Sequence, residues 1–388
     1  MSVLSKSVEH YCHTADDYYK KQTNPNALLH KPFMSLVEAS NSLAKLGPLL
    51  EGLHLGKKMT VLDFGAGSCW LARFLALLDC RPVCLDVSAT ALALGERLFK
   101  LWPPLDESVE QPQFLLFDGK RIDLSDESID RVVCFEALHH VPNPAEVLAE
   151  IFRVLKPGGI AGFAEPGEHH SQTQFSQSEM INYDVLELDI CVSDIWNTAR
   201  HLGFTDIRFR LFSFPTIDMS LEQRDALIRG VLPESVVGHL AQSMSDWSIF
   251  FLHKGSLILD SRGTAGLLGS LTVLDAPRTV SRGQEFNIRV RCSNTGTATW
   301  LAPSTYRDVG TVKLGPHLYD QDMRLVTFDM YREPLPRQVP PGTSCDAIAK
   351  FQPLPPGEYV ITFDLVAEHV TWFEAMGTVP ATVRVRIE

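Results

Sequence analysis

The sequence lacks the paired cysteines that mark a zinc site or a disulfide scaffold. Its eight cysteines are scattered through 388 residues, and no two of them form a Cys-x-x-Cys pair. Cys80 and Cys84 are four residues apart, but no matching Cys/His pair follows them. Cys84 and Cys134 lie in apolar runs, where a reduced thiol packs as a small hydrophobic side chain. We therefore expect free thiols and predict no metal site.

Positive charge is scarce as well. The chain has 35 Lys and Arg against 47 Asp and Glu, which gives a formal net charge of −12. Binding to nucleic acid needs a basic surface that neutralises phosphates, and stable docking on anionic lipid needs one too. The charge balance therefore argues against nucleic acid as a partner and against a permanent place on an anionic membrane.

Long apolar runs are missing too. No stretch reaches the length that a membrane span requires. The first residues, MSVLSKSVEHYCHTADDYYKK, are charged throughout and have no apolar core of a signal peptide. From these absences we expect a cytoplasmic protein without a membrane span.

The chain is longer than a single hydrophobic core usually serves, so two domains are expected. Up to about Lys254, apolar runs of strand length alternate with amphipathic helical stretches. Beyond Gly269, short alternating strands are separated by Gly, Pro and Asn, and the join between the two textures is rich in glycine. We assign residues 1–264 to the first domain, with residues 1–50 as a helical lead-in, and residues 265–388 to the second.

The first domain alternates hydrophobic strands with amphipathic helices. Strands are predicted at 60–64, 82–86, 113–117, 131–135 and 160–164. Helices are predicted at about 70–78, 89–101 and 145–155. This order predicts an α/β fold in which helices cover both faces of a parallel sheet.

The turn after the first predicted strand carries the strongest signal for a ligand. Asp63 lies near the end of the strand, and Gly65 and Gly67 let the backbone turn tightly and approach a ligand before a helix begins. Ligands of such sheets bind at the carboxyl ends of the strands. A glycine turn alone does not distinguish this site from a dinucleotide site.

Three further features follow the next strands. Asp86 ends the second strand, where a carboxylate can accept both hydroxyls of a ribose, and Asp118 and Gly119 end the third. The segment Cys-Phe-Glu-Ala-Leu-His-His-Val at 134–141 follows the fourth strand, and Leu-Lys-Pro-Gly-Gly at 155–159 precedes the fifth. In this order the motifs resemble the class I, Rossmann-like S-adenosylmethionine-dependent methyltransferases, in particular the type 11-like branch that acts on small molecules.

That resemblance covers about residues 55–165 and implies S-adenosyl-L-methionine as the cofactor. Gly65 and Gly67 would pass under its methionine part, and Asp63 would bond its ammonium group, directly or through water. The sequence departs from the family at Cys69, which stands where a third glycine is usual. This departure perturbs the turn without undoing the assignment.

The same resemblance places the rest of the cofactor on the following strands. Asp86 would hold the ribose, with Val87 lining the adenine. Asp118 and Gly119 would border the adenine as well. An alternative for both acids is a capping or turn role, which Asp commonly fills.

Two residues after the fourth strand, Phe135 and Glu136, would close the pocket near the sulfonium. His139 and His140 follow them; either one lies near the acceptor, or they are turn residues that cap the strand. Glu187 and Asp189, on a helix expected over 176–190, are candidates to meet hydroxyls or a cation, or are plain surface acids.

The loop after the fifth strand is the best candidate for the acceptor side. Methyl transfer to an alcohol needs a base within hydrogen-bond reach of the hydroxyl. Glu165, His169 and His170 lie close together here. We predict His169 or His170 as the general base, and Glu165 as its orienting partner or as a ligand of a sugar hydroxyl. The alternative is a solvated polar loop.

The second domain is predicted to be an all-β, immunoglobulin-like sandwich of short alternating strands. Its Asn-Thr-Gly-Thr-Ala-Thr-Trp segment at 294–300 resembles sandwich modules that accompany bacterial surface-polysaccharide enzymes. Such a module would bind glycan, hold a partner enzyme of polysaccharide assembly, or form an oligomer interface. Trp300, Trp372 and Phe373 are candidates to stack on sugar rings, and core packing is the alternative.

Together these observations predict an O-methyltransferase that acts on a sugar hydroxyl during assembly of bacterial surface polysaccharide such as O-antigen or capsule. A second hypothesis is a methyltransferase for a small lipid-like or quinone acceptor, which an apolar acceptor pocket would support. A third is a non-catalytic binding protein on a degenerate methyltransferase fold, against which the intact Asp63, Gly65, Gly67 and Asp86 speak.

Overall fold

The computed structural model describes residues 6–103, 110–303 and 308–388, and the chain divides into two compact units. The first unit comprises the residues up to Leu55 together with Met59–Leu257, and the second comprises Gly56–Lys58 and Ile258–Glu388. The expected boundary at 264/265 falls within the second unit. Residues 1–5 of the expected lead-in lie outside the described residues.

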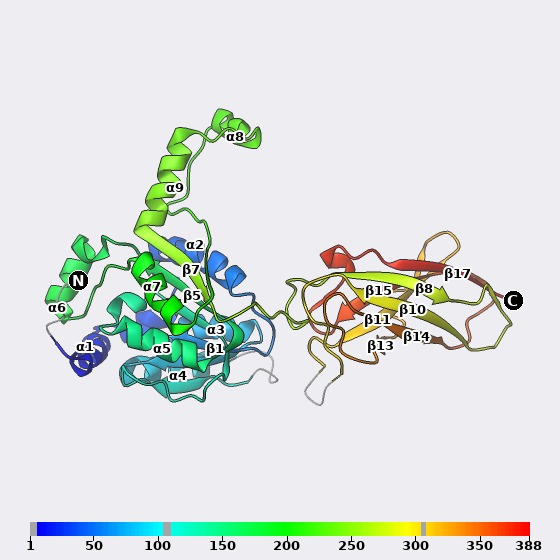
Figure 1. Cartoon of the computed structure of the whole chain (residues 1–388), viewed down its shortest axis with the longest axis horizontal. Coiled ribbons are helices and arrows are strands. Elements are labelled where there is room, and N and C mark those ends of the chain that lie inside the picture. Colours follow the sequence, from blue (N-terminus) through cyan, green and yellow to red (C-terminus); the bar gives the residue numbers. More distant parts are fainter. Residues whose placement is uncertain (1–5, 104–109, 304–307) are drawn as a thin grey trace. The chain divides into compact units, whose positions relative to one another are not determined.

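A seven-stranded sheet forms the centre of the first unit (Figure 1). Its order is β3-β2-β1-β4-β5-β7-β6; the first five strands of this order are parallel, and β7 runs antiparallel to both β5 and β6. The strands are β1 Thr60–Phe64, β2 Arg81–Asp86, β3 Gln113–Leu116, β4 Ile129–Phe135, β5 Leu155–Pro166, β6 Asp206–Phe209 and β7 Trp247–His253. The chain crosses over between β1 and β4, and a crevice for a ligand opens at the carboxyl ends of strands on either side of such a crossover.

Helices cover the two faces of this sheet. Alternate residues of β1 explain why, because Val61 packs with helices on one face and Leu62 with helices on the other. The Val61 face is covered by α2 and α3, beside which α4 packs, and the Leu62 face by α5 and α7. These helices are α2 Leu36–Gly52, α3 Trp70–Leu77, α4 Ala89–Leu101, α5 Pro144–Val154 and α7 Val192–Leu202. The predicted Rossmann-like α/β fold is thus present in the first unit.

Two predicted elements differ from the structure. Strand β5 begins at Leu155 instead of 160, because the Lys-Pro-Gly-Gly segment continues the strand after a shift in its register with β4. The helix expected over 176–190 is α6, Gln174–Tyr183, and it ends where Asp184 adopts a left-handed conformation with φ of 59°. The residues after Asp184 are therefore not helical, and Glu187 contacts His140 and His170.

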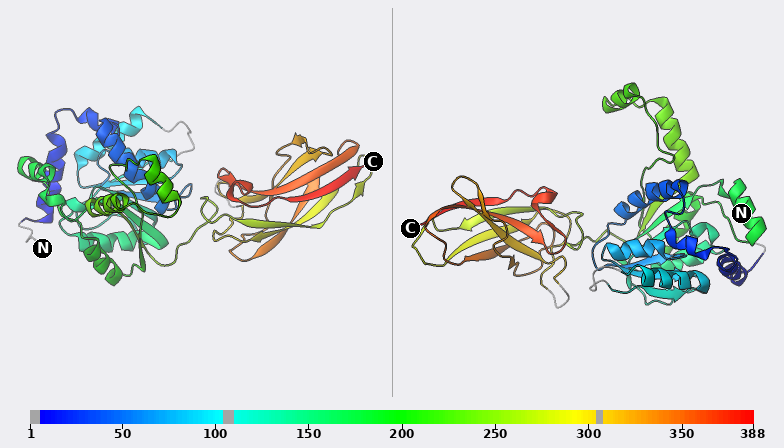
Figure 2. Two further views of the ribbon diagram at one scale, coloured as in Figure 1. Left: turned by 90° about the horizontal axis from the view of Figure 1, so that it is seen from above. Right: turned by 180° about the vertical axis from the view of Figure 1, so that it is seen from behind.

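Three further helices complete the first unit. Helix α1, Val8–Lys20, packs against α4 and α6. Helices α8, Leu221–Ile228, and α9, Glu234–Asp246, project from the body of the unit ahead of β7, as Figure 1 and Figure 2 both show. Among the described residues, no helix combines the length and the apolar character that crossing a bilayer requires.

The second unit contains two β-sheets that share one core. One sheet has the order β14-β10-β8, and the other has the order β12-β11-β15-β17-β9, with β13 and β16 paired beside it. The strands are β8 Gly269–Asp275, β9 Thr279–Val280, β10 Phe286–Asn294, β11 Val312–Asp320, β12 Leu325–Thr327, β13 Glu333–Pro334, β14 Ser344–Phe351, β15 Gly357–Ala367, β16 Thr371–Trp372 and β17 Ala381–Ile387.

Alternation along these strands builds the core. In β10, Ile288 and Val290 point inward and meet Phe363 and Leu365 of β15. This β-rich unit is the second domain expected from the sequence, and its immunoglobulin-like character stays a prediction.

The aromatic residues expected to stack on sugars are mostly in this core. Trp300 and Phe373 are fully buried, and their rings meet edge to face with centroids 5.3 Å apart. They therefore take the packing alternative, because a buried ring has no face free for a sugar. Trp372 is half-buried and lies against Gly315, with the Arg332 guanidinium 5.2 Å from its ring centroid.

Candidate active site

The glycine turn between β1 and α3, predicted to hold the cofactor, is a tight turn of left-handed residues. Gly65 and Gly67 have φ of 70° and 54°, in the left-handed region that favours glycine. A Cβ on Gly65 would lie 2.4 Å from the Cβ of Ala137. The amides of Gly65 and Ala66 both donate to the carbonyl of Leu85 at the end of β2. These hydrogen bonds therefore fix the turn to the sheet, and the space beside Gly65 leaves no room for a side chain.

Cys69 fits this turn because of a glycine in the next helix. Its φ of 58° is left-handed, as a third glycine would allow, and it is fully buried at the start of α3. A Cβ on Gly95 of α4 would lie 2.2 Å from the Cys69 sulfur. The missing side chain at Gly95 thus makes room for the thiol, a compensation that the sequence analysis did not find.

Asp63 and Asp86 are buried at the carboxyl ends of β1 and β2. Asp63 Oδ2 accepts a hydrogen bond of 3.1 Å from the amide of Ala72 in α3. Asp86 accepts 2.8 Å hydrogen bonds from the amides of Gly67 and Ser88, one on each oxygen. Burial raises the pKa of Asp63 to about 7 and that of Asp86 to about 6. Through its hydrogen bonds with the amides of Gly67 and Ser88, Asp86 links the glycine turn to the start of α4.

The capping role considered for Asp86 belongs to Ser88, whose hydroxyl accepts from the amide of Ala91 at the start of α4. Asp118 does take the turn role, because its Oδ1 accepts from the amides of Lys120 and Arg121 at 2.8 Å each. Its contribution to an adenine site, like that of Gly119, stays a prediction. Val87 is half-buried and packs beside the core of the unit.

Helix α1 lies directly over this cofactor side, which the sequence analysis missed. The Asp16 carboxylate accepts from the Ser88 hydroxyl at 2.7 Å and from the Thr90 amide at 2.9 Å. The Tyr19 hydroxyl would be 2.7 Å from a Cβ on Gly67. The only sequence signal was the cluster of tyrosines and acids near the start of the chain, whose partners are distant in sequence.

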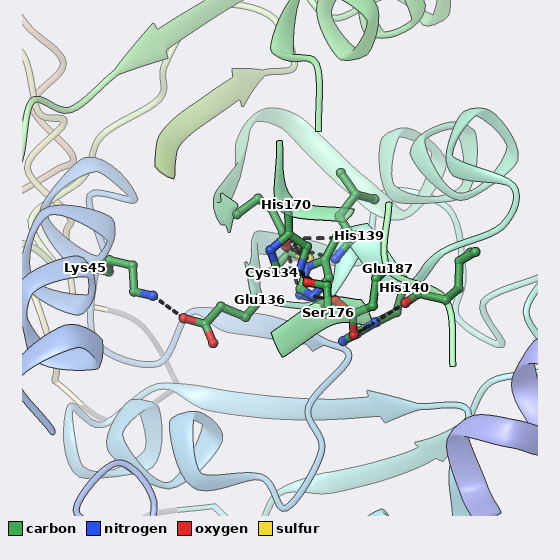
Figure 3. A network of polar contacts seen from close by, with 12 residues as sticks. Lys45, Cys134, Glu136, His139, His140, His170, Ser176 and Glu187 are labelled. Carbon is green, nitrogen blue, oxygen red and sulfur yellow. Dashed lines mark hydrogen bonds and ion pairs between the residues drawn. The ribbon is translucent and has the colours of Figure 1, made fainter. Parts of the chain in front are cut away.

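A buried lysine closes the site near Phe135 and Glu136. Lys45 of α2 is fully buried, forms an ion pair with Glu136, and holds its ammonium 3.4 Å from the ring centroid of Trp247 (Figure 3). Burial lowers the pKa of Lys45, and the Glu136 carboxylate opposes this shift. Lys45 was not among the residues predicted from the sequence, although a lone Lys within an apolar helix face was a usable signal.

Glu165 and His139 form the central pair of the region predicted to face the acceptor. Glu165, fully buried in β5, accepts from the amides of Ala137 and Leu138 at 2.9 Å each through Oε1. Its Oε2 lies 2.8 Å from His139 Nδ1. Burial is the largest single influence on Glu165 and raises its pKa, but the hydrogen bond and the charge of His139, together with the amides of Leu138 and Ala137, outweigh burial, so the pKa of Glu165 is lowered. The structure therefore pairs Glu165 with His139, and not with His169 or His170, while its orienting role stays a prediction.

The histidines predicted as general base are placed differently from each other. His170, in the short 3-10 helix His170–Gln172, has its Nε2 2.6 Å from Glu187 Oε2 and 3.2 Å from the Ser176 hydroxyl. The His169 side chain is exposed and makes no hydrogen bond or ion pair within the described ranges. The structure thus brings His170 to the site and leaves His169 outside it.

Glu187 joins these groups into one network (Figure 3). Its Oε2 lies 3.9 Å from His139 Nε2, and its Oε1 lies 3.6 Å from His140 Nδ1. His140 Nδ1 donates to the Leu186 carbonyl at 2.6 Å. One ligand atom each of His139, His170 and Glu187 lies within 4.8 Å of the others. Asp189 stays apart and accepts from the Ser171 amide.

Comparison with known proteins shows which family the segment with these features resembles. Residues 62–163 match the model of the methyltransferase domain family. A malonyl-[acyl-carrier protein] O-methyltransferase of Marinomonas sp. (strain MWYL1) is 25% identical over 226 residues, which cover 53% of this chain and 75% of that protein.

Two further relatives either match a shorter part of this chain or are less similar to it. A ubiquinone biosynthesis O-methyltransferase of Pseudomonas putida (strain GB-1) is 33% identical over 110 residues, or 28% of this chain and 44% of that protein. The solved structure of an S-adenosylmethionine-dependent methyltransferase from Mesorhizobium loti has 15% identity and a TM-score of 0.42, covering 55% of this chain and 99% of that one.

The chain spans less than half the length of several of the curated relatives it matches, among them the ubiquinone biosynthesis O-methyltransferase. The match itself lies on the strands, turns and helices that surround the glycine turn, and it includes Asp86, Asp118 and the residues after β4. The first unit therefore contains a methyltransferase domain of the class I, S-adenosylmethionine-dependent kind.

Proposed function

We propose that the protein is an S-adenosylmethionine-dependent O-methyltransferase that methylates a sugar hydroxyl in the biosynthesis of a bacterial surface polysaccharide. The observation that carries this proposal is the His139–Glu165 pair, which ends at the same edge of the sheet as the glycine turn. A buried carboxylate that fixes one nitrogen of an imidazole leaves the other as a base of defined direction.

The cofactor side fits S-adenosylmethionine. The donor group supplies an electrophilic methyl carbon, whose bond to sulfur breaks as a bond to the acceptor oxygen forms. Gly65 and Gly67 would hold its methionine part against bare backbone, and Asp86 would accept the ribose hydroxyls. Asp63 is already bonded to the amide of Ala72, so its second oxygen or a water would meet the ammonium group.

His139 would take the proton of the acceptor hydroxyl. Glu165 accepts the Nδ1 proton of His139, so the lone pair is on Nε2, which faces Glu187 and His170. As the hydroxyl oxygen attacks the methyl carbon, its proton passes to Nε2, and the negative charge of Glu165 stabilises the imidazolium. Positioning of the oxygen in line with the methyl group contributes the rest of the rate.

The acceptor side favours a polar acceptor. Carboxylates and imidazoles of Glu187, His140 and His170 surround His139 and can bind neighbouring hydroxyls of a sugar. The second unit would add a surface for glycan or for another enzyme of polysaccharide assembly. The half-buried Trp372, beside Arg332, is the aromatic residue that supports a sugar contact there.

A second candidate is methylation of a small lipid-like or quinone acceptor. A hollow of about 290 Å³ adjoins the loop after β5, and its apolar lining includes Phe209, Phe212, Met244, Trp247 and Ile249. These apolar side chains would pack on such an acceptor, beside the polar lining residues Glu168, Ser193, Arg210, Ser245 and Ser248 of the same hollow. The named activity of the Pseudomonas putida relative is consistent with the same class.

A methyl-transfer assay against a panel of acceptors separates these candidates. The full chain is incubated with methyl-labelled S-adenosylmethionine and, in parallel, with nucleotide sugars, surface polysaccharide and reduced quinones. We expect label in the sugar or polysaccharide, released as an O-methyl sugar on hydrolysis. Label in the quinol alone would replace the proposal by the second candidate, and no transfer by a chain that binds the cofactor would overturn both.

A further inference from the structure

Three side chains of the acceptor side converge with the chemistry of a metal site. His139 comes from the 3-10 helix after β4, His170 from the loop after β5, and Glu187 from the extended segment after α6 (Figure 3). His170 Nε2 lies 2.6 Å from Glu187 Oε2, and His139 Nε2 lies 3.9 Å from the same oxygen. All three ligand atoms lie within 4.8 Å of one another.

The spacing suits a small cation with tetrahedral geometry. Zn²⁺ binds imidazole nitrogen and carboxylate oxygen at about 2.0–2.2 Å, which places neighbouring ligand atoms roughly 3.3 Å apart. The distances of 2.6 and 3.9 Å lie on either side of this value. Two imidazoles and one carboxylate also form a known zinc ligand set that leaves a fourth position open.

Surrounding groups support this use of the three residues. A metal-binding histidine usually donates its other ring N–H to a carboxylate, and His139 Nδ1 is held in this way by the buried Glu165. Glu187 and His139 are both buried, while His170 is partly exposed and leaves a route from solvent. Zinc would replace the contact between Glu187 and His170, and the Ser176 hydroxyl next to it would remain as a neighbour.

We propose that His139, His170 and Glu187 bind a Zn²⁺ ion and that this ion inhibits methyl transfer. The inhibition rests on the proposed function, because zinc occupies the Nε2 lone pair with which His139 would accept the acceptor proton. Binding itself does not rest on it. No covalent bond of the chain is made or broken when the ion binds; protons on the imidazoles are released, while Glu187, whose pKa the hydrogen bond from His170 and the neighbouring histidines lower against the effect of burial, is already ionised.

A zinc titration of the full chain tests the binding. The protein is stripped with chelator and titrated with Zn²⁺ against a chromogenic competitor, and Co²⁺ is used as a spectroscopic substitute. We expect one tight equivalent, with an affinity lowered at least tenfold in His170→Ala and in Glu187→Gln. His169→Ala is the matched control, because this adjacent histidine lies outside the cluster, and it should retain wild-type affinity.

Two results would overturn the site. One is wild-type zinc affinity in both His170→Ala and Glu187→Gln. The other is a strong thiolate-to-Co²⁺ charge-transfer band, which would assign the ion to some of the eight free cysteines. Circular dichroism and affinity for S-adenosylmethionine show whether each variant is folded, and Glu187→Gln is nearly isosteric, so at least one variant remains informative.

The inhibition is measured against each variant's own zinc-free rate. Stoichiometric Zn²⁺ should reduce wild-type methyl transfer at least tenfold, chelator should restore it, and His170→Ala should be insensitive to the same concentration. A rate that zinc raises or leaves unchanged would overturn the inhibition. A chain that binds zinc at these residues but transfers no methyl group without zinc would overturn the proposed function and leave the metal site standing.

Discussion

At the scale of single residues, Cys69 and Gly95 form a compensating pair. Cys69 is the point where the sequence departs from its family, and its sulfur occupies the space that Gly95 leaves open. A glycine motif read along the sequence gives the position of the turn, but this contact joins residues 26 positions apart across two helices. Local patterns do not contain such contacts.

Substitution at Gly95 tests this pairing. Gly95→Ala places a methyl group 2.2 Å from the Cys69 sulfur and should lower the free energy of unfolding by about 1–3 kcal/mol, the usual effect of overpacking. Cys69→Gly in the same chain should restore most of the loss, because it removes the clash and suits the left-handed backbone. Chemical denaturation of the two single variants and the double variant measures the coupling. Additive effects of the two substitutions would refute it.

We expect Asp86 to make cofactor binding depend on pH. Burial raises its pKa to about 6, so the empty protein carries a neutral Asp86 at low pH. An ionised carboxylate is the better acceptor for ribose hydroxyls, so affinity for S-adenosylmethionine should rise about tenfold from pH 5 to pH 7.5. Calorimetric titration across this range measures the change. Asp86→Asn should bind weakly at every pH, and an equally steep profile in this variant would assign the effect to Asp63, whose pKa burial raises to about 7.

His139 shows how far sequence alone could identify the acceptor side. The histidines and acids of this region were all recognised, and Glu165 was given an orienting role. The sequence could not pair them, because Glu165 in β5 meets His139 after β4 only through the register of two neighbouring strands. Nearness in sequence favoured His169 and His170, of which only His170 reaches the site.

At the scale of elements, the parallel strands were the most predictable part. Buried apolar runs bounded by Asp and Gly placed β1, β2 and β4 to within a residue or two. The strand β5 and the helix α6 were less predictable, because a Gly-Gly segment continued a strand and a left-handed Asp184 ended a helix early. Both departures depend on neighbouring elements, and the second one brings Glu187 into the site.

None of the sequence motifs predicted a role for helix α1, yet this helix contacts the residues at the start of α4, next to the predicted cofactor site. Its anchor is Asp16, which accepts from the Ser88 hydroxyl and the Thr90 amide at the start of α4. Hydrogen bonds to a charged group contribute about 1.5–3 kcal/mol each. Asp16→Ala should therefore release α1 from α4 and weaken S-adenosylmethionine binding by about tenfold or more.

Asp17→Ala is the control for this prediction. Asp17 is the next residue of α1, and its carboxylate pairs only with Lys20 and His13 of the same helix among the described residues. Its loss should leave cofactor affinity unchanged. Equal effects of the two substitutions, measured by calorimetry, would mean that α1 acts through its helical stability and not through the Asp16 anchor.

At the scale of the whole molecule, two cores account for two units. The change in hydrophobic pattern along the sequence predicted this division. Beyond it, apolar residues alternate with a period of two between frequent turns, instead of following the β-α alternation of the first unit. The buried clusters of the first unit share no member with that of the second, since the former lie around the sheet of β1 and β4 and the latter centres on β10 and β15. What the second unit binds could not be predicted, because its aromatic residues are mostly needed for its own core.

A fragment of residues 1–264 should therefore fold and bind the cofactor without the second unit. We expect its affinity for S-adenosylmethionine to equal that of the full chain within about twofold, as for a domain with its own core. Its activity on a polymeric acceptor should fall if the second unit binds glycan, while activity on a small sugar persists. A fragment that is unfolded by circular dichroism would show that the first unit depends on the second.

The measurement that tests the central claim most directly is a single-turnover methyl transfer with His139→Ala. With the acceptor and cofactor saturating, the rate constant should fall by about 10²–10⁴, the range expected for loss of a general base. Affinity for S-adenosylmethionine should stay at the wild-type value, because His139 contributes to the acceptor side only. A wild-type rate constant in this variant would contradict the assignment of His139, with Glu165 behind it, as the base.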